Sequence, residues 1–334
     1  MVAAEPQDGT RSTRVLVTGA GGPAAIGFMR LSQRPDVELW AADMDPVATG
    51  LYLVPRTRRV VVPAGAHPGF VEALLDVCHL HRIEVLVPTV DAELLPLARA
   101  RHRFEAAGTR VLVQDAEVLE RCLDKHALAR TCTGVVPVPH TELLEEGTEV
   151  SLPAVLKPRS GSGSRGVHVL PAGAAVPSLP RDGSHVVQEL LPGEELSVDV
   201  LVRADGHVVA AVPRTRDRVD SGVAVAGRVV ADPAARSMAR RTAEHLGIRG
   251  VANVQLRRRA DGSLALLEVN PRLPGTLVLT AAAGANLAAL LLAEALGEDV
   301  PAWVPVRPVA VVRHLTEVVV PLEEYLEGAE AVSA

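Results

Sequence analysis

The chain changes its pattern of apolar residues near residue 135, and this change limits the folds open to it. From Arg14 to about Thr131, short apolar runs alternate with segments of helical periodicity. The segment Gly69–Arg82, for example, carries its apolar residues on one side of a helix. Runs such as RVLVT and EVLVP lack polar alternation, which is typical of strands buried on both faces. Strands that alternate with helices predict a parallel sheet covered by helices.

Beyond Val135 the expected strands are closely spaced and are joined by turns rich in Gly, Asp and Pro. Turn signals at Asp205–Gly206 and Asp261–Gly262 predict two hairpins. Between them, the spacing predicts a helix from about Pro233 to Leu246 that ends at Gly247. The fold class expected from the sequence is therefore α/β in the N-terminal part and α+β in the rest.

Length and composition narrow the functional classes. A chain of 334 residues is long for one core, so two or three domains or subdomains are expected. The formal net charge of −6 gives no reason to expect nucleic acid as a partner. The three cysteines are odd in number and lack CxxC spacing. This argues against a disulfide framework or a zinc site and favours a cytoplasmic location.

Two segments bear on targeting and membrane insertion. Residues 1–13 are small and polar without the apolar centre of a signal peptide, and we expect a disordered tail there. The stretch from Leu277 to Leu296 is apolar enough to raise the question of a membrane span. It contains Gly284, Asn286 and Glu294, which favour a pair of buried helices, and no membrane partner is expected.

A first glycine-rich loop, TGAGGPAAIG, follows the first expected strand at Thr18–Gly27. Such a loop lets backbone N–H groups face a ligand at a helix N-terminus, as in dinucleotide-binding folds. The strict GxGxxG spacing fails, since Ala24 takes the third glycine position and Pro23 intervenes. Asp43 ends the second expected strand, where such a fold holds a ribose. A nicotinamide site and a plain tight turn both remain open.

A second loop, in AVLKPRSGSGSRGVHVL at Ala154–Leu170, lies between two expected strands. It is not a P-loop, because its lysine precedes the glycines. A hairpin of this composition can fold over phosphates as a flap and offer them backbone N–H groups and hydroxyls. Lys157 brings a compact ammonium to the same place. Of the 34 basic residues only Lys125 and Lys157 are lysines, which makes an incidental surface lysine the weaker interpretation. The flap donors are Ser160, Gly161, Ser162, Gly163, Ser164 and Gly166.

The stretch LLEVNPR, Leu266 to Arg272, gathers oxygen donors. Strand alternation puts Glu268 and Asn270 on one face, and Gln255 on the partner strand of the hairpin can face the same way. Carboxylate and amide oxygens suit Mg²⁺ together with phosphate and water. Arg272 follows at once and can meet a phosphoryl group or a substrate anion. The alternative is an exposed polar face of an edge hairpin.

The order of these motifs resembles the ATP-grasp superfamily, in the branch similar to carbamoyl phosphate synthase that holds many single-unit carboxylate–amine ligases. The match covers nearly the whole chain. It comprises the glycine-rich N-terminal domain and then LDKHALA, VLKPRSGSGSRGV, VVQELLPGEELSVD, VANVQL and LLEVNPR. The resemblance implies a pre-ATP-grasp domain at residues 14–115. It further implies an ATP-grasp fold with a small subdomain at 116–192, which includes the flap, and a C-terminal subdomain at 193–334, which includes the magnesium-binding strands.

The resemblance also implies ATP-binding roles. Lys125, Lys157 and the flap would contact phosphates, while the hinge would meet adenine. The hinge residues are Gln188, Glu189, Leu190 and Leu191. Glu195, with Glu194 as the alternative, would accept the ribose hydroxyls.

The metal ligands implied by the resemblance are Gln255, Glu268 and Asn270, with Glu268 bridging two ions. Arg272 would steady the γ-phosphate or the acyl-phosphate. Catalytic roles thus fall on Arg272, Lys157 and Arg214, the last chosen over Arg216 and Arg218 as the arginine that faces the substrate. The cofactors implied are ATP and two Mg²⁺ ions, for which Mn²⁺ can substitute.

The function implied is an ADP-forming ligase that joins a small carboxylate, such as an amino acid, to an amine through an acyl-phosphate. Its partners would be small molecules. Members of the family often form dimers, so the resemblance makes a homodimer an expectation. An NAD(P)-dependent oxidoreductase that uses the Thr18–Gly27 loop is the first alternative, and a non-catalytic nucleotide-binding module is the second. Asp91 is interpreted as a helix cap, and His207, His245 and His314 as structural or exposed residues.

Overall fold

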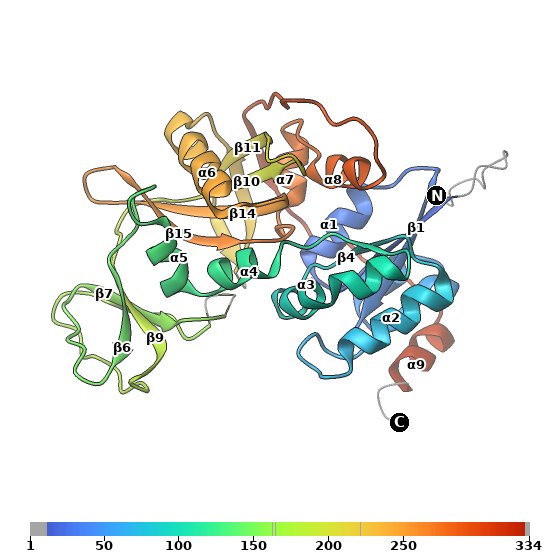
Figure 1. The fold of residues 1–334 in the computed structure, drawn as a ribbon, viewed down its shortest axis with the longest axis horizontal. Coiled ribbons are helices and arrows are strands. Elements are labelled where there is room, and N and C mark those ends of the chain that lie inside the picture. Colours follow the sequence, from blue (N-terminus) through green and yellow to red (C-terminus); the bar gives the residue numbers. More distant parts are fainter. Residues whose placement is uncertain (1–11, 162, 164, 221, 331–334) are drawn as a thin grey trace. The chain divides into compact units, whose positions relative to one another are not determined.

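A computed structural model describes residues 12–330 apart from 162, 164 and 221. Nearly all of the expected N-terminal tail, and the flap residues Ser162 and Ser164, lie outside these residues. The chain divides into two compact units, whose elements are labelled in Figure 1. The first takes the chain up to Val113, the segment Ala288–Asp299 and the part from Leu315 onward. The second takes Gln114–Leu287 and Val300–His314.

The first unit is built on a parallel sheet in the order β3-β2-β1-β4-β5, which confirms the expected α/β domain. Its strands are β1 (Thr13–Val17), β2 (Val37–Asp43), β3 (Arg59–Val61), β4 (Val85–Val87) and β5 (Arg110–Val111). Its helices are α1 (Pro23–Leu31), α2 (Phe70–His81), α3 (Asp91–Ala106), α8 (Leu287–Ala295, from Ala288 on) and α9 (Leu322–Glu330), with short 3₁₀ turns η1 (Thr49–Leu53) and η2 (Arg56–Arg58). Its core is formed by buried residues such as Leu16, Leu86, Phe70 and Phe104.

The second unit contains a large antiparallel sheet in the order β12-β13-β11-β10-β14-β15, with β16 paired to β13. Its strands are β10 (Glu195–Val202), β11 (Val208–Thr215), β12 (Arg218–Asp220), β13 (Val223–Val229), β14 (Gly250–Arg258), β15 (Leu264–Asn270) and β16 (Val309–Val312). The hairpin turns predicted at Gly206 and Gly262 are confirmed, with φ values of +91° and +83° that a glycine adopts without strain.

One face of this large sheet is apolar. Its side chains pack with three helices, α4 (Ala116–Leu123), α5 (Lys125–Cys132) and α6 (Pro233–Leu246), and Figure 1 shows α6 along β10 and β11. Leu196, Val198 and Val254 are among the fully buried residues of this core. Helix α6 has the predicted bounds and ends at Gly247, whose φ is +75°. The opposite face of the sheet is left for polar side chains, because alternate residues of a strand point to opposite faces.

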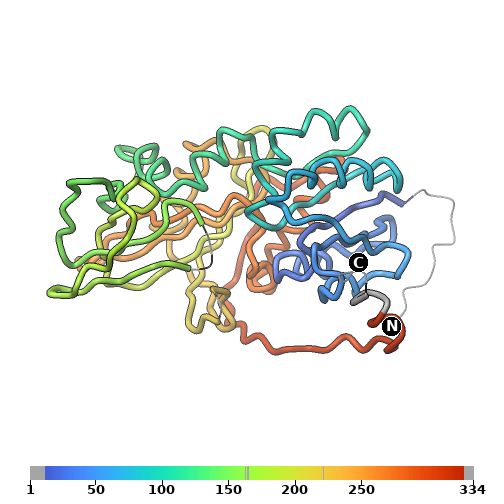
Figure 2. Tube along the Cα trace, turned by 90° about the horizontal axis from the view of Figure 1, so that it is seen from below, coloured from blue at the N-terminus to red at the C-terminus, as the bar shows by residue number. Residues whose placement is uncertain are grey.

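A smaller antiparallel sheet in the order β6-β9-β7-β8 belongs to the same unit and is green in Figure 2. Its strands are β6 (Thr141–Glu145), β7 (Ala154–Pro158), β8 (His168–Leu170) and β9 (Asp182–Glu189). Leu144, Leu156 and Leu170 form its small core. The glycine-rich loop joins β7 to β8, so it is a hairpin loop as predicted.

The apolar stretch from Leu277 to Leu296 is divided between α7 (Leu277–Ala282) and α8, with Gly284 between them at φ +111°. Leu279 and Leu292 are fully buried. Within the described part of the chain, no helix has the length and apolar character to cross a membrane.

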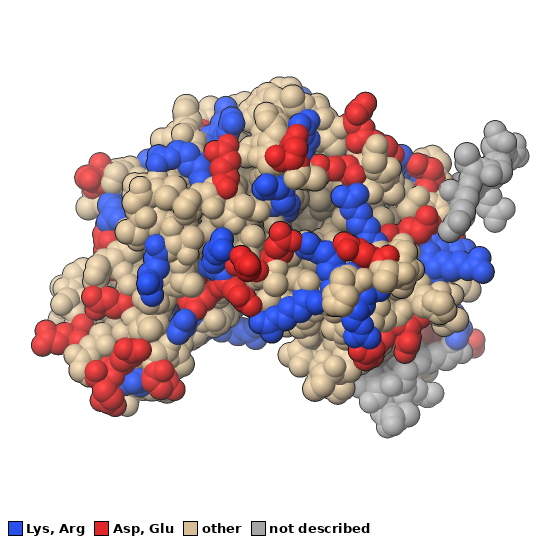
Figure 3. Space-filling view, viewed as in Figure 1, with Lys and Arg blue, Asp and Glu red and all other residues tan. Residues whose placement is uncertain are grey.

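Charged side chains of both signs are interspersed on the face shown in Figure 3. Many form surface ion pairs, such as Arg103 with Glu72 at 2.6 Å. Exposed pairs of this kind contribute little to stability, whereas buried charges need specific partners.

Candidate functional site

The polar face of the large sheet gathers the predicted metal ligands. In the β14–β15 pair, Gln255 lies directly opposite Glu268, and Asn253 lies directly opposite Asn270. All but Asn253 are partly buried, while Asn253 is 4% exposed. The sequence-based placement of Gln255, Glu268 and Asn270 on one face is therefore confirmed.

Strand β10 extends this polar face. Its Ser197 lies opposite Gln255, and its Asp199 lies opposite Asn253. Asp199 is fully buried and accepts two hydrogen bonds of 3.0 Å from Arg214, one from the Nδ2 atom of Asn253 at 2.7 Å and one from Thr280. A carboxylate without solvent needs such partners, because an unpaired buried charge is very costly.

Arg214, predicted as a catalytic residue, thus has its guanidinium engaged in a bidentate pair with Asp199 and is 3% exposed. Arg216 instead binds Glu195, with Nη1 3.3 Å from Oε1, and donates to the carbonyl of Gly222. Arg218 is exposed on β12. The three arginines of this segment therefore lie in three different surroundings.

Lys157, on β7 of the small sheet, is 7% exposed, and its Nζ donates to Gln188 Oε1 at 2.8 Å. Gln188, predicted as a hinge residue, in turn donates to the hydroxyl of Thr141 at 2.9 Å. The side chain of Gln188 is consequently a support for the lysine. Thr141 was not singled out from the sequence, because nothing in its local pattern marks it.

Lys125 begins α5 and is also buried, at 9% exposure. Its Nζ donates to the carbonyl of Gly161 at 2.9 Å, and its backbone N–H donates to the carbonyl of Arg159. Asp124 caps the helix by accepting from the backbone of His126 and Ala127. Both lysines of the chain therefore lie near the start of the flap: Lys157 precedes it in β7, and Lys125 bonds its carbonyl groups.

Electrostatics connect the small sheet with the polar face of the large one. Burial lowers the pKa of Lys157 to about 8, and the neighbouring Lys125 ammonium acts in the same direction, whereas Glu268 and Glu195 oppose the shift. Lys125, Glu268 and Glu195 are thus close enough to affect Lys157. A cation pair and a carboxylate pair in one place suit a ligand that carries both negative phosphates and divalent cations.

The described residues of the flap are exposed. They are Ser160, Gly161, Gly163 and Gly166, and the three glycines have φ values of +131°, +70° and +69°. Gly163 lies against Gly222 in the β12–β13 turn, since a Cβ atom on Gly222 would be 3.4 Å from the Cα atom of Gly163. The flap therefore meets the large sheet at that turn.

The hinge residues lie at the end of β9 and directly after it, in different surroundings. Glu189 forms an ion pair with Arg259 and accepts from the backbone of His140, while Leu191 is 2% exposed and Leu190 is partly buried. Glu195 pairs with Arg216 and acts on Lys157, whereas Glu194 is exposed. This difference favours Glu195 of the two ribose candidates.

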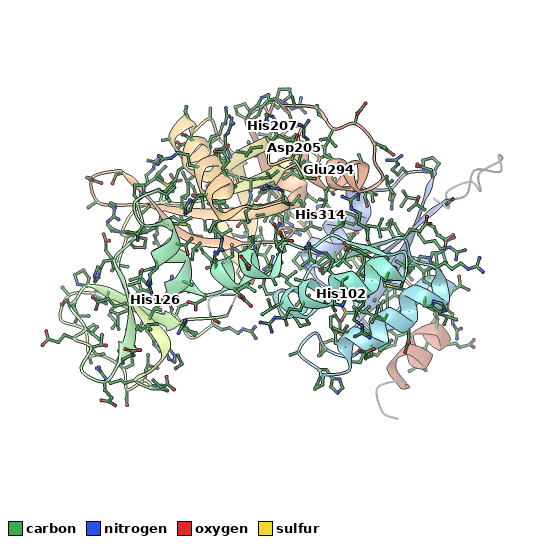
Figure 4. The ribbon with its side chains drawn as sticks, in the orientation of Figure 1. His102, His126, Asp205, His207, Glu294 and His314 are labelled. Carbon is green, nitrogen blue, oxygen red and sulfur yellow. The ribbon has the colours of Figure 1, made fainter. Side chains whose placement is uncertain are left out.

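Arg272 follows β15 and is partly buried. Its backbone N–H donates to the carbonyl of Asn270, and its Nη1 donates to the carbonyl of Leu273. The histidines set aside from the sequence lie as expected: His207 bonds the Ala302 carbonyl beside Asp205 (Figure 4), and His314 is exposed. His245 bonds the Thr131 carbonyl.

The donor set on β14 and β15 fits magnesium that is carried by a nucleotide. Gln255, Glu268 and Asn270 offer hard oxygen atoms with a single carboxylate among them. In the described residues no group of three or more His, Cys, Asp and Glu side chains gathers as a metal site. Mg²⁺ bound by few carboxylates takes its remaining ligands from phosphates and water.

The first glycine-rich loop is packed by its own chain. Asp43 accepts from the backbone N–H of Gly21 at 2.8 Å and of Asp45 at 2.9 Å, so both of its oxygens are engaged. A Cβ atom on Gly50 would lie 2.0 Å from the carbonyl oxygen of Ala20, which shows how closely η1 approaches the loop. These contacts within the loop and with η1 agree with the tight-turn interpretation.

Comparison with protein families agrees with this geometry. The model of the family described as ATP-grasp in the biosynthetic pathway with Ter operon matches residues 182–318. The model of the PylC-like N-terminal domain matches residues 15–112. Two family models thus identify an ATP-grasp region and a PylC-like N-terminal domain in this chain, which has the ATP-grasp fold. The Gln255–Glu268 pair and the hinge both fall within the matched ATP-grasp region.

Among curated proteins, a D-alanine--D-alanine ligase of Thermotoga petrophila is 32% identical over 119 residues, which are 33% of this chain. The match spans about two fifths of that ligase (39%). An ADP complex of N5-carboxyaminoimidazole ribonucleotide synthetase has a TM-score of 0.71, covers 96% of both chains and is 14% identical. The L-amino acid ligase of Bacillus licheniformis has a TM-score of 0.63, covers 86% of this chain and 74% of its own, and is 18% identical. These structures share the ATP-grasp fold.

Asp199 and Thr280, like Thr141, are site residues that sequence reasoning missed. Strand alternation from Glu195 through Ser197 reaches Asp199 on the same face, so the period of two was a usable signal for it. Thr280 lies in α7, far along the sequence, and only the tertiary fold brings it to Asp199.

Proposed function

We propose that this ATP-grasp protein is an ATP-dependent, ADP-forming ligase that joins a small carboxylate, such as an amino acid, to an amine. The observation that carries the proposal is the electrostatic proximity of buried Lys157 to Glu268 and Glu195. A phosphate-binding cation and a metal-binding carboxylate would then act on the same nucleotide. The similar D-alanine--D-alanine ligase and L-amino acid ligase support this class of reaction.

In the proposed reaction a carboxylate oxygen attacks the γ-phosphorus of ATP, and the bond between that phosphorus and the bridging oxygen of ADP breaks. The amine then attacks the acyl carbon, loses a proton, and phosphate leaves. Lys125 and Lys157 would neutralise the phosphates, and Arg272 would bind the transferred phosphoryl group. The flap would keep water from the acyl-phosphate, which hydrolyses readily.

Gln255, Glu268 and Asn270 would hold Mg²⁺, as one ion or two. When bound, the metal supplies charge neutralisation for the transferring phosphoryl group. Adenine would meet the hinge from Gln188 to Leu191, and Glu195 would accept the ribose hydroxyls. The proposal includes a pre-ATP-grasp domain at 14–115 and ATP-grasp subdomains at 116–192 and 193–334. A cytoplasmic location and a homodimer stay predictions.

The test is a phosphate-release screen with Mg²⁺–ATP in which amino acids, dipeptides and small acids are offered singly and in pairs, with products identified by mass. We expect ADP, phosphate and an amide in equal amounts for one pair. ATP turnover without any amide product for any pair would contradict ligation.

Glu268→Gln is the matched variant for the metal assignment, because it keeps the side-chain shape and removes the charge. We expect it to abolish amide formation while it retains part of the nucleotide affinity. A non-catalytic nucleotide-binding module would bind ATP and show no turnover in either protein. An oxidoreductase would be stabilised against heat by NAD(P)H instead of Mg²⁺–ATP, and the engagement of Asp43 by the backbone N–H of Gly21 is the observation against it.

A further inference from the structure

Two side-chain amides on the polar face of the large sheet form a relay that starts at Asp199. The Nδ2 atom of Asn253 lies 2.7 Å from Oδ1 of Asp199. An ionised carboxylate only accepts hydrogen bonds, so Asn253 must direct its NH₂ group at Asp199. The oxygen of the Asn253 amide is thereby fixed on the other side of that group.

The second step of the relay reaches Gln255. Its Nε2 atom donates to Oδ1 of Asn253 over 3.4 Å, which is long but within hydrogen-bonding range. Because this end of the Gln255 amide is the donor, its Oε1 atom lies on the side away from Asn253. Only Oε1 can ligate a cation, and Gln255 stands directly opposite Glu268 in the β14–β15 pair.

We propose that Asp199 is a positioning residue that makes Gln255 present its oxygen, and not its NH₂ group, to a divalent cation beside Glu268. The inference rests on the proposed function, because it needs a metal at that place. An amide is nearly symmetric in shape, and a flipped Gln255 would turn two positive N–H dipoles toward the cation. Asn253 prevents the flip of Gln255, because a flipped Gln255 would set its oxygen against Oδ1 of Asn253. Asn253 cannot flip to relieve this, because its own oxygen would then face the Asp199 carboxylate.

Arg214 and Thr280 also donate hydrogen bonds to Asp199. The guanidinium of Arg214 donates to both carboxylate oxygens at 3.0 Å, and the hydroxyl of Thr280 donates to Oδ2. This arrangement gives the buried Arg214 a role as the partner of Asp199. A buried ion pair of this kind is weak evidence for stability, whereas fixing the direction of a polar network is a recognised use of one.

The test is a double-mutant cycle read out by Mn²⁺ binding in the presence of ADP, measured from the electron paramagnetic resonance signal of unbound Mn²⁺. Asn253→Ala breaks the relay, and we expect Mn²⁺ affinity to fall by about 10-fold, as is common when the support of a metal ligand is removed. Gln255→Glu makes both ends of the side chain oxygen, so orientation no longer matters.

When Asn253 is present, Gln255→Glu places a carboxylate against the fixed oxygen of Asn253, and the two repel each other. In the Asn253→Ala protein this repulsion is absent. We therefore expect Gln255→Glu to raise Mn²⁺ affinity about tenfold more in the Asn253→Ala protein than in the wild type. An equal effect of Gln255→Glu in both backgrounds, or unchanged affinity in Asn253→Ala, would overturn the relay.

Two controls separate the possible failures. Gln114 is another buried amide of the same unit, which accepts from the backbone N–H of Arg249 at 2.8 Å, and Gln114→Ala should lower thermal stability without changing Mn²⁺ affinity. Glu268→Gln should abolish tight Mn²⁺ binding. If Glu268→Gln left binding unchanged, the metal site of the proposed function would fail, whereas loss in Glu268→Gln with no effect of Asn253→Ala would reject the relay alone.

Discussion

Lys157 on β7 donates from Nζ to Oε1 of Gln188 on β9 at 2.8 Å, in a place where the lysine is 7% exposed. Gln188 lies opposite Val155, so it reaches the lysine diagonally across the same sheet face. The buried space beside Gln188 therefore holds a slender side chain that ends in a compact charge. This relationship explains why one of the few lysines of an arginine-rich chain stands here.

We predict that Lys157→Arg weakens ATP binding by about 10- to 100-fold. A planar guanidinium does not fit the contact with Gln188. The loss of a charged hydrogen bond is worth about 1.5–3 kcal/mol, which corresponds to this change in affinity. Isothermal titration with Mg²⁺–ATP measures the change. Arg165→Lys, the reverse exchange on the exposed flap, is the control and should bind as the wild type does. Normal ATP affinity in Lys157→Arg would show that the space beside Gln188 does not require a lysine.

A second prediction concerns pH. Burial lowers the pKa of Lys157 to about 8 in the protein without ligand, and phosphates favour its charged form. ATP affinity should therefore fall as pH rises above about 8, by up to roughly tenfold per pH unit, with proton uptake on binding. The affinity measured from pH 7 to 9.5 tests this, a range in which the nucleotide phosphates are already ionised. Lys157→Met should give a weaker but flat profile.

The same lysine has the opposite effect on folding. Between its folded pKa of about 8 and its ordinary value of 10.5, the folded protein binds fewer protons than the unfolded chain. The contribution of Lys157 to stability consequently increases as pH rises through that window. An ATP affinity and a stability that change in the same direction with pH would contradict this assignment.

Local rules predicted much of the framework. The helix from Pro233 to Leu246 with its Gly247 cap follows from periodicity and a left-handed terminal residue. Placement of Gln255 and Glu268 on one face follows from the period of two. The cap of α3 was predicted wrongly: the helix starts at Asp91, Val90 is the N-cap residue, and Glu93 accepts from the Val90 backbone. A carboxylate three residues into a helix can satisfy the same N–H group that a capping side chain would.

Partners of buried polar groups were beyond sequence reasoning. Lys157 meets Gln188, and Asp199 meets Arg214 and Thr280, through strand registers and helix positions set by the whole fold. The function of Arg214 illustrates the consequence. Its residue type and segment suggested a substrate contact, and only the register of β10 and β11 brings it to Asp199.

A third prediction uses Glu93, which is 5% exposed in the first unit and accepts from the Thr18 hydroxyl at 2.6 Å. Burial raises the pKa of Glu93 to about 7 from an ordinary 4.5. A raised pKa means that the folded state binds more protons, so this carboxyl makes the protein less stable as pH rises from 4.5 to about 7. Glu93→Gln should remove that loss and, relative to the wild type, gain up to ~3 kcal/mol between pH 4.5 and 7.5.

Urea unfolding at several pH values measures this effect. The exposed Glu105, also on α3, provides the control, because Glu105→Gln removes a carboxyl that stays in water. A difference between Glu93→Gln and wild type that stays constant across the pH range would show that Glu93 is not the titrating group.

The last prediction distinguishes the two neighbouring glutamates at the start of β10, Glu194 and Glu195. Glu195 approaches Arg216 and Arg257 at 3.3 and 4.0 Å and acts on Lys157, while Glu194 is exposed. If Glu195 accepts a ribose hydroxyl, removal of the 2′-hydroxyl should cost about tenfold in affinity for wild type and for Glu194→Gln, because a hydrogen bond to a charged acceptor is lost. Glu195→Gln should bind ATP more weakly and should distinguish ATP from 2′-deoxy-ATP much less.

Competition titrations with the two nucleotides supply the ratio of the two affinities, which cancels any general effect of a variant on folding. Equal discrimination in Glu195→Gln and Glu194→Gln would place the ribose elsewhere in the second unit.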